Sequence, residues 1–356
     1  MEKVAEICAQ AIKDRVFSGC VVGCALPDGS FWTNAYGADD YEGGVKLTEH
    51  SIFDIASVTK SVPVATLALK GILEGILDLH DPVCSQIPEL SNACREQIQL
   101  WHLLTHSLDF RFPMSTLKDL PAAEILQRIF SHPFAEPPGT LFNYGNAASI
   151  LLGLFLQRKF KASLPELAQN AFFSPMGMVD SGWFPLQRLD VARIVPTEQC
   201  SWRGKTMRGE VHDESAYTLQ NLGAAGAAGM FSTVPDLLRF ARMMLADGVH
   251  DNQRILPAGV LHLVTQNALP HLAGQSAAFG WELANRKFMG SVASPHSFGK
   301  TGFTGASMVC DPSRNAAVVL LSNFTWPKRE PNVERIYEIR RRVHDALFAA
   351  IPVTES

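Results

Sequence analysis

The positions of the strand-like segments along the chain constrain its fold most strongly. Residues 19–26 and 31–36 are short apolar or aromatic runs joined by a Pro-Asp-Gly turn, a pattern that predicts two paired strands near the start. Residues 306–310 and 316–321 form a second such pair near the end, separated by Asp-Pro-Ser-Arg. Because strands require partners, the simplest arrangement joins both ends of the chain in one antiparallel sheet.

The middle of the chain carries apolar residues at helical spacing, most clearly at residues 62–79, 98–104 and 147–156. Further on, Thr233 with Asp236 three positions later is typical of a capped helix start. Amphipathic patterns at the two ends of the chain predict one further helix each. Helices therefore separate the two strand-rich ends.

We expect from this order an α+β fold with two domains. Residues 1–60 together with 220–356 would form an α/β domain, in which helices flank the antiparallel sheet. Residues 61–219 would form a mainly helical inserted domain, with the functional site between the two.

Composition and charge argue against a nucleic-acid-binding protein and against a membrane-spanning protein. An apolar content of 47% with 19% charged residues is ordinary for a globular protein, and a net charge of -4 leaves no electrostatic footprint for nucleic acid. No apolar run approaches the roughly 18 to 20 residues that span a bilayer. We expect a small-molecule or short-peptide substrate as partner, while the oligomeric state stays open.

The cysteines and the first residues bear on location. Seven cysteines, an odd number without a C-x-x-C pair, favour a reducing compartment over a disulfide framework and give little support to a metal or redox site. The start of the chain has an interrupted helical stripe and lacks the basic and then apolar pattern of a signal peptide. We therefore expect a cytoplasmic protein without metal or cofactor; a periplasmic protein whose leader has been removed is the alternative.

Several familiar motifs fail on a single residue. The string around Lys300 resembles the end of a phosphate-binding loop, but Ser294 stands where that loop needs glycine. His102 and His106 have the spacing of a zinc protease, but leucine replaces the glutamate, which favours a packed pair over a metal site. The run His-Asp-Glu at residues 212–214 could ligate a cation, yet we expect a solvated loop there. The glycine-rich residues 223–229 contain no G-x-G of a dinucleotide site, and the G-x-S-x-G of an α/β-hydrolase occurs nowhere in the chain.

A serine and a lysine three positions apart occur three times, beginning at Ser57, Ser115 and Ser297, so spacing alone cannot rank them. If Ser57 begins a helix, Lys60 lies on the same face and can reach its hydroxyl. A serine hydroxyl is a weak nucleophile that needs such a base, and a helix start offers backbone N–H groups for an oxyanion. The pair is therefore a candidate nucleophile with its base.

Two further motifs each occur once. Tyr144-x-Asn146 is the only Y-x-N, and it precedes a predicted helix; a tyrosine near a buried lysine can shuttle protons, and asparagine can hold that lysine and a substrate amide. Lys300-Thr301-Gly302 is the only K-T-G; its lysine and hydroxyl can attract a substrate carboxylate, while glycine lets the substrate lie against a strand. Each motif alone is more often structural, but the set in this order is hard to obtain by chance.

The three motifs together resemble the signatures of the serine β-lactamase and penicillin-binding-protein superfamily. The tyrosine of the second motif is similar to the class C type, which is shared with D,D-peptidases, D-aminopeptidases and β-lactamase-like carboxylesterases. The sequence similarity to this superfamily extends over almost the whole chain and includes the segments "FDIASVTK", "PGTLFNYGN", "GEVHDESA" and "FGKTGFTG". The resemblance implies the β-lactamase/transpeptidase-like fold, which agrees with the sheet and insertion expected above.

The resemblance also implies catalytic roles. Ser57 would be the nucleophile that forms an acyl-enzyme, and Lys60 and Tyr144 would share the proton transfers, with either as the acylation base. The backbone N–H groups of Ser57 and Phe303 would form the oxyanion hole. Nothing matches the separate deacylating glutamate of class A enzymes, so a water activated near Tyr144 would release the acyl group.

Substrate binding is implied for the remaining motif residues. Asn146 would orient Lys60 and the substrate amide, and Lys300, Thr301 and Gly302 would bind the anionic end of the substrate. The chain departs from the family at residue 145, where glycine replaces the usual serine or alanine, and at residues 107–110, which read Ser-Leu-Asp-Phe instead of Thr-Ser-Gly-Leu. The second departure leaves the shape of a loop near the site, and with it the substrate, open.

We therefore expect a serine hydrolase acting on a β-lactam, a D-amino-acid peptide or a small carboxylic ester. K-T-G favours a carboxylate-bearing substrate, whereas the lack of a signal peptide argues against a dedicated periplasmic enzyme; a cytoplasmic esterase or peptidase reconciles the two. The alternative is a non-catalytic scaffold or binding protein that retains the fold. The presence of all the catalytic residue types argues against that alternative.

Overall fold

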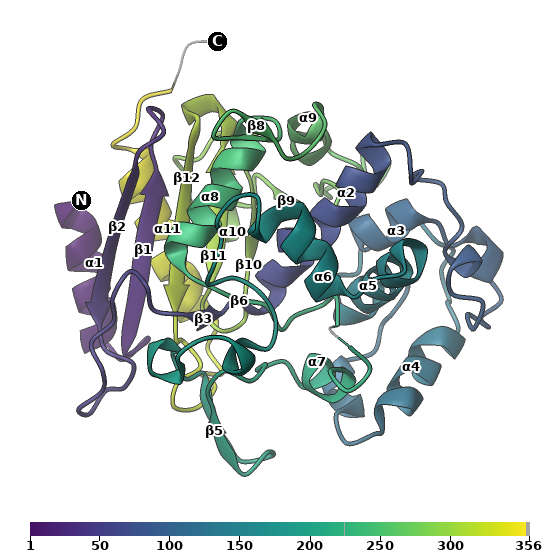
Figure 1. Ribbon diagram of the computed structural model, residues 1–356, viewed down its shortest axis with the longest axis horizontal. Helices are drawn as coiled ribbons and strands as arrows, with labels where there is room; N and C mark the ends of the chain where they lie inside the picture. Colours follow the sequence, from purple (N-terminus) through teal and green to yellow (C-terminus); the bar gives the residue numbers. More distant parts are fainter. Residues whose placement is uncertain (224, 354–356) are drawn as a thin grey trace.

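A six-stranded antiparallel sheet built from both ends of the chain forms one side of the molecule (Figure 1). The computed structural model describes residues 1–223 and 225–353. The strand order is β2-β1-β12-β11-β10-β9, and β1 pairs with β12 so that Cys20 lies opposite Ser322. The expected joining of the two ends is thus confirmed. The bounds are β1 Gly19–Ala25, β2 Phe31–Gly37, β9 Glu282–Leu283, β10 Phe298–Thr301, β11 Ser307–Asp311 and β12 Ala316–Ser322.

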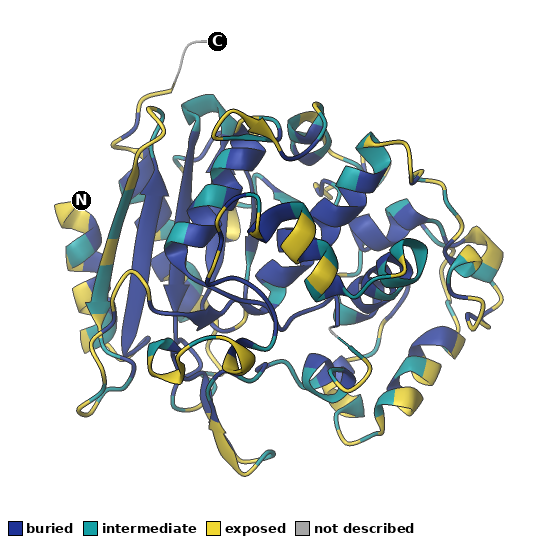
Figure 2. Ribbon diagram, in the orientation of Figure 1, coloured by how far each residue is buried: buried dark blue, intermediate teal, exposed yellow. Residues whose placement is uncertain are grey.

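Helices cover both faces of this sheet. The terminal helices α1 (Glu2–Lys13) and α11 (Glu334–Phe348) pack together on one face, with α10 (Arg286–Met289) beside α11, and α8 (Val234–Leu245) packs on the other. The central strands β1 and β12 are buried along their whole length, as Figure 2 shows, because helices lie on both sides of them. The helix start expected at Thr233 is confirmed, since its side chain accepts the N–H of Asp236 at the beginning of α8.

The middle of the chain forms a helical part beside the sheet (Figure 1). One hydrophobic cluster runs from the sheet into these helices and includes Val21, Phe298 and Leu151. The helical part is therefore packed against the sheet, while the domain boundaries near residues 60 and 220 stay a prediction. Its helices, with α9 from the following segment, are α2 Thr66–Leu73, α3 Leu100–Thr105, α4 Ala122–Ser131, α5 Asn146–Phe160, α6 Leu164–Ala168, α7 Glu214–Leu219 and α9 Val260–Thr265.

Short two-stranded pairings complete the fold. They are β3 (Phe53–Asp54) with β6 (Phe231–Ser232), β4 (Glu198–Cys200) with β5 (Lys205–Met207), and β7 (Val249–His250) with β8 (Gln253–Arg254). The pairing of β3 with β6 fixes the chain just before the candidate nucleophile.

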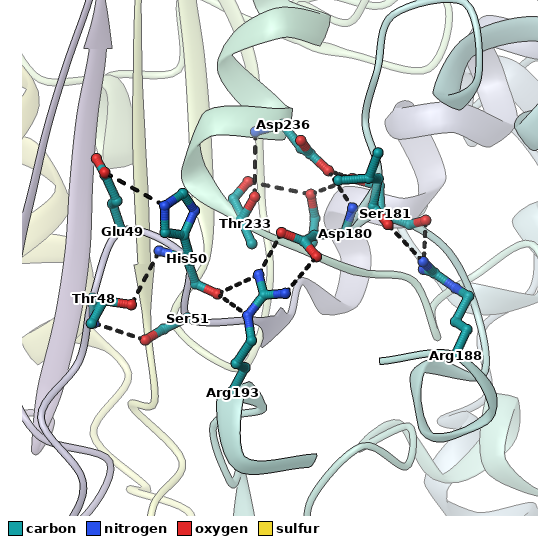
Figure 3. A network of polar contacts seen from close by, with 12 residues as sticks. Thr48, Glu49, His50, Ser51, Asp180, Ser181, Arg188, Arg193, Thr233 and Asp236 are labelled. Atoms are coloured by element: carbon teal, nitrogen blue, oxygen red, sulfur yellow. Dashed lines mark hydrogen bonds and ion pairs between the residues drawn. The ribbon is translucent and has the colours of Figure 1, made fainter. Parts of the chain in front are cut away.

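A polar network ties the loop before β3 to the segment that leads into β4 (Figure 3). Arg193 donates to the carbonyl oxygen of His50 at 2.9 Å and to Asp180 at 2.9 Å. Asp236, in the first turn of α8, accepts the backbone N–H of Asp180 at 3.0 Å and the hydroxyl of Ser181 at 2.9 Å. Buried carboxylates held in this way fix distant segments relative to one another.

The helix expected over residues 62–79 is shorter than predicted. Residues Ser61–Ala65 form a π-helical turn, in which Val62 is not helical (φ -108°, ψ 107°), and α2 follows it directly from Thr66. It ends at Leu73, shortly before Gly75 takes a left-handed conformation (φ +70°). The spacing of apolar residues indicates neither the irregular start nor the early end of this helix.

Two further observations bear on the sequence expectations. All seven cysteines are free thiols. No helix among residues 1–223 and 225–353 is long and apolar enough to cross a bilayer.

Candidate active site

Ser57 lies in a 3₁₀ turn, Ala56–Lys60, between β3 and α2. Ser57 does not begin an α-helix as expected. In a 3₁₀ turn, however, residues three apart lie directly above one another along the axis, so Ser57 and Lys60 still share a face. Ala56 takes the left-handed conformation (φ +46°) and donates its N–H to the carboxylate of Asp54 at 2.8 Å. Such backbone strain in a residue other than glycine persists only where the surroundings enforce it, and it gathers at functional sites.

The ammonium group of Lys60 is buried and fixed by three partners. Its Nζ donates to Ser57 Oγ at 2.9 Å, to Asn146 Oδ1 at 2.8 Å and to the carbonyl oxygen of Ala227 at 2.7 Å, and the residue is only 3% exposed. Burial lowers the pKa of Lys60 below its usual value; Tyr144 and Asp213 offset part of this effect, and the charge of Lys300 adds to it. A lysine in this state can give up a proton more easily than a surface lysine.

Tyr144 lies between two ammonium groups in the loop before α5. The centroid of its ring is 5.5 Å from Lys60 Nζ and 4.2 Å from Lys300 Nζ. Although 44% of the residue is exposed, its hydroxyl faces these charges. Burial raises the pKa of Tyr144, but the positive charges of Lys300 and Lys60 lower it by more, so the pKa lies below its ordinary value.

His106 packs its ring against Tyr144 at a centroid distance of 4.8 Å. It ends α3 in the left-handed conformation (φ +54°), so it does not share a helix face with His102, as the spacing had suggested. Burial, together with the charges of Lys300 and Lys60, lowers the pKa of His106 well below its usual value. Its ring is therefore neutral and does not compete with the lysines for Tyr144.

Lys300 and Thr301 occupy the end of β10, beside Tyr144. Lys300 is buried and donates to Glu282 Oε1 at 3.1 Å. Burial lowers the pKa of Lys300, but its interactions with Tyr144 and with the Glu282 carboxylate raise it by more, so this lysine stays charged. Thr301, which is half-buried, follows directly and leads into Gly302 and Phe303.

Phe303 is held by its ring and leaves its backbone N–H free. In the part of the chain that the structure describes, this N–H has no hydrogen-bond partner. The ring stacks on His212 at a centroid distance of 5.8 Å, and the guanidinium of Arg329 lies 5.9 Å from its centroid. A cavity of about 290 Å³ is lined by Ser57, Thr301 and Phe303.

Two more hollows meet this cavity at Tyr144, which lines all three. One, of about 340 Å³, is lined also by His106, Glu282 and Lys300. The other, of about 450 Å³, lies beside Asn146. Together they offer room for substrate groups around Tyr144, next to the cavity that Ser57 lines.

The expectation of a solvated loop at residues 212–214 is wrong. His212 is 2% exposed and its Nε2 lies 3.0 Å from Glu198 Oε2, while Asp213 caps α7 and accepts from Asn146 Nδ2 at 2.8 Å. Asp213 therefore belongs to the site, and sequence reasoning missed it. The aspartate with its following Glu-Ser-Ala was a helix-cap signal, but the contact to Asn146 spans 67 residues and has no local signature.

The structure thus brings together the residues of all three motifs: Ser57, Lys60, Tyr144, Asn146, Lys300, Thr301, Gly302 and Phe303. The other two candidate serines do not approach Lys60: Ser115 is exposed on the rim of the hollow beside Asn146, and Ser297 is buried against Ser294, although Lys300 of its pair belongs to the site. Among the described residues, no group of three or more histidine, cysteine or acidic side chains could hold a metal ion.

Comparisons with known proteins agree with this geometry. A family model described as Beta-lactamase matches residues 4–341. A protein of Escherichia coli K12, provisionally named D-alanyl-D-alanine carboxypeptidase, is 26% identical over 329 residues, which cover 82% of this chain and 74% of that protein.

Solved structures share the fold. EstCE1, described as a hydrolase with promiscuous acyltransferase activity, superposes with a TM-score of 0.73 at 22% identity, covering 96% of this chain and 98% of its own. A class C β-lactamase superposes with a TM-score of 0.73 at 17% identity, covering 97% and 96% of the two chains.

Proposed function

The chain belongs to the Beta-lactamase family, and from this premise we propose that it is a serine hydrolase that forms an acyl-enzyme on Ser57. The observation that carries the proposal is the hydrogen bond of 2.9 Å between the buried Lys60 ammonium and Ser57 Oγ, beside a tyrosine that lies between two lysines. A hydroxyl in this setting has the neighbouring base that a serine nucleophile requires.

In the proposed mechanism, Ser57 attacks the scissile carbonyl and its proton passes to the Lys60–Tyr144 pair. The two groups titrate together, so the base is the pair and not either residue alone. The N–H groups of Ser57 and Phe303 would stabilise the oxyanion of the tetrahedral intermediate. Tyr144 would then protonate the leaving group and, in the second half of the reaction, activate the water that hydrolyses the acyl-enzyme.

The proposed substrates are esters, D-amino-acid peptides or β-lactams. Lys300 and Thr301, with Gly302 at the strand end, would attract a carboxylate on the substrate, because the pKa of Lys300 stays above its usual value and keeps this buried group charged. The name of the Escherichia coli relative is consistent with a peptide substrate, and the fold shared with EstCE1 is consistent with an ester.

We propose further that both expected domains contribute to the site. Ser57, Lys60 and Lys300 come from residues 1–60 and 220–356, and Tyr144 and Asn146 come from residues 61–219. The seven free thiols support a reducing compartment such as the cytoplasm.

The decisive experiment is labelling with a fluorescent penicillin and a fluorophosphonate. We expect at least one probe to label the protein, Ser57→Ala to abolish labelling, and Ser131→Ala, on the surface helix α4, to leave it intact. A protein that neither probe labels would refute the enzyme and favour the scaffold. Labelling that persists in Ser57→Ala would refute Ser57 as the nucleophile.

A further inference from the structure

The side-chain amide of Asn146 has no hydrogen-bond donor left for a substrate. Its Oδ1 accepts from Lys60 at 2.8 Å, and its Nδ2 donates to Asp213 Oδ2 at 2.8 Å and to Ser215 Oγ at 3.0 Å. An amide nitrogen carries two hydrogens, so both donors are used.

The chemistry of the partners fixes this orientation of the amide. A lysine ammonium can only donate and a carboxylate can only accept. If the Asn146 amide were flipped, its NH₂ group would face the donors of Lys60 and its oxygen would face the acceptor oxygen of Asp213. Ser215 donates its single hydrogen to Asp213 Oδ1 at 2.6 Å, and it can therefore only accept from Asn146. The amide has one arrangement in which every group is paired.

Asp213 is itself held in place. It caps α7 by accepting the backbone N–H of Ala216 at 2.9 Å. Burial raises the pKa of Asp213, but the charge of Lys60 and the surrounding hydrogen bonds lower it by more, so the group remains a carboxylate. The chain of contacts from Asp213 through Asn146 to Lys60 therefore does not loosen near neutral pH.

On the basis of the function proposed above, we propose that Asn146 is a positioning residue for Lys60 with no donor for a substrate, and that the enzyme acts on esters whose acyl group carries no amide next to the scissile carbonyl. N-acylated D-peptides and acylamino β-lactams bring an amide carbonyl to this place. Where the bound substrate excludes water from Asn146, such a carbonyl loses its hydrogen bonds to water and gains no donor from this amide.

The hollow of about 450 Å³ beside Asn146 has a mixed lining with polar and charged side chains, and its apolar part can take an apolar acyl chain. Phe112 and Met114 line it with apolar atoms. Gly145 is extended (φ -169°), a conformation that any residue adopts, and a Cβ built on it would meet nothing within 4 Å. The departure from the family at this position therefore leaves room beside Tyr144 and is not required by the backbone.

A matched pair of esters tests the inference on the unaltered protein. Phenyl isocaproate is the hydrocarbon counterpart of phenyl N-acetylglycinate, because methylene replaces the amide nitrogen and a methyl-bearing carbon replaces the amide carbonyl. Each kcat/KM is divided by the rate constant for hydroxide-catalysed hydrolysis of the same ester, since the amide activates the neighbouring carbonyl. We expect the normalised value to be higher for the isocaproate by about tenfold.

The outcomes separate this inference from the proposed function. Ser57-dependent hydrolysis with an equal or higher normalised value for the N-acetylglycinate overturns the inference and leaves the serine hydrolase intact. Absence of Ser57-dependent hydrolysis of either ester, together with failure of both covalent probes, overturns the proposed function itself.

Ser215→Ala provides a gain-of-function test. The substitution should free one hydrogen of Asn146 at the edge of the hollow and raise the normalised value for the N-acetylglycinate, relative to the isocaproate, about fivefold. An unchanged ratio in a folded variant would show that the second Asn146 donor is not withheld from the substrate, against the inference.

Asp213→Asn tests the positioning role through the pH profile. Removing the negative charge disfavours protonated Lys60, so the acid limb of kcat/KM should move to lower pH while kcat falls. The other titratable groups around Lys60 are Tyr144, Lys300 and His106, and the substitution changes none of them. An acid limb that stays in place, or moves to higher pH, would show that Asp213 does not act on Lys60 and serves only as the cap of α7.

An exposed aspartate supplies the control for this measurement. The side chain of Asp251 is 92% exposed, so Asp251→Asn should leave both the pH profile and kcat unchanged.

Discussion

Gly302 touches the backbone of Ile55, and a Cβ on Gly302 would lie only 2.3 Å from the carbonyl oxygen of that residue. Ile55 directly precedes the turn that carries Ser57, and Gly302 directly precedes Phe303. The segments that bear the proposed nucleophile and the second oxyanion donor are therefore in backbone contact, which a residue without a side chain permits.

Gly302→Ala should separate these segments and slow acylation. A contact at 2.3 Å cannot persist, so the end of β10 must move away from the turn by several tenths of an ångström. Because misplacement on this scale weakens oxyanion stabilisation, we expect kcat/KM for a phenyl ester to fall about a hundredfold.

The control for this change is a glycine whose substitution strains the backbone without touching a neighbour. Gly43 has φ +75°, and a Cβ at this position would meet nothing within 4 Å, so Gly43→Ala should cost about 1 kcal/mol of stability and leave the rate unchanged. Equal rates for Gly302→Ala and the wild type would show that the contact does not set the distance between Ser57 and Phe303.

Tyr144→Phe should slow turnover about a hundredfold, the usual scale of lost acid–base help. The variant keeps the ring between Lys60 and Lys300 and removes only the hydroxyl. Tyr36→Phe is the matched control, because Tyr36 lies in the edge strand β2 and lines none of the three hollows at the site. The measurement is steady-state kinetics. If Tyr144→Phe and Tyr36→Phe both turned over at the wild-type rate, Tyr144 would have no part in the proton transfers.

Lys300→Gln should move the acid limb of kcat/KM to higher pH. Burial raises the pKa of Tyr144 and Lys300 lowers it; Lys300 also lowers the pKa of Lys60. Loss of this positive charge therefore raises the pKa of both groups, and the deprotonated form of the pair appears only at higher pH. We expect a displacement of about one pH unit.

A neutral ester must be used for this profile, because an anionic substrate would also lose its attraction to residue 300. Lys118→Gln, in one of the other two serine–lysine strings, should leave the limb in place. A limb that moves to lower pH in Lys300→Gln would contradict the electrostatic account of Tyr144.

The sheet could be predicted because the sequence signals for its strands lie within the strands and the turns next to them. Residues 19–26 and 316–321 are apolar runs bounded by turn signals, and such runs can be buried only by pairing with other strands. The cap at Thr233 was predictable for the same reason, since a cap and its helix adjoin in sequence. The set of three motifs in fixed order likewise pointed to Ser57 among three candidates, and the structure brings the residues of the three motifs together.

The rest of the site depends on contacts between distant segments. Ser57 lies in a 3₁₀ turn, and Gly302, from near the other end of the chain, touches the residue that precedes this turn; apolar periodicity indicates neither feature. Asp213 meets Asn146 across 67 residues, and the resulting loss of free donors on Asn146 appears only when all its partners are in place. Sequence patterns identify residue types, but pairing depends on the assembled fold.

The helix α11 supports the proposed oxyanion loop through one buried side chain. Arg340 Nη2 donates to the carbonyl oxygens of Gly302 at 2.7 Å and Ala306 at 2.9 Å, which flank Phe303. Burial lowers the pKa of Arg340 to about 10, so the guanidinium is charged at neutral pH and its hydrogen bonds are strong.

Arg340→Ala should therefore loosen the loop without unfolding the protein. Both carbonyl oxygens keep a backbone partner, since Gly302 accepts from Gly305 at 3.1 Å and Ala306 accepts from Gly302 at 2.7 Å, so we expect a stability loss of about 1–3 kcal/mol. The rate of acylation by a fluorophosphonate should fall about tenfold, because the N–H of Phe303 is no longer held in register. Arg342→Ala, on the exposed side of the same helix, should change neither quantity. Acylation at the wild-type rate in a destabilised Arg340→Ala would mean that the strand pair β10–β11 alone positions Phe303, and that Arg340 serves only the packing of α11.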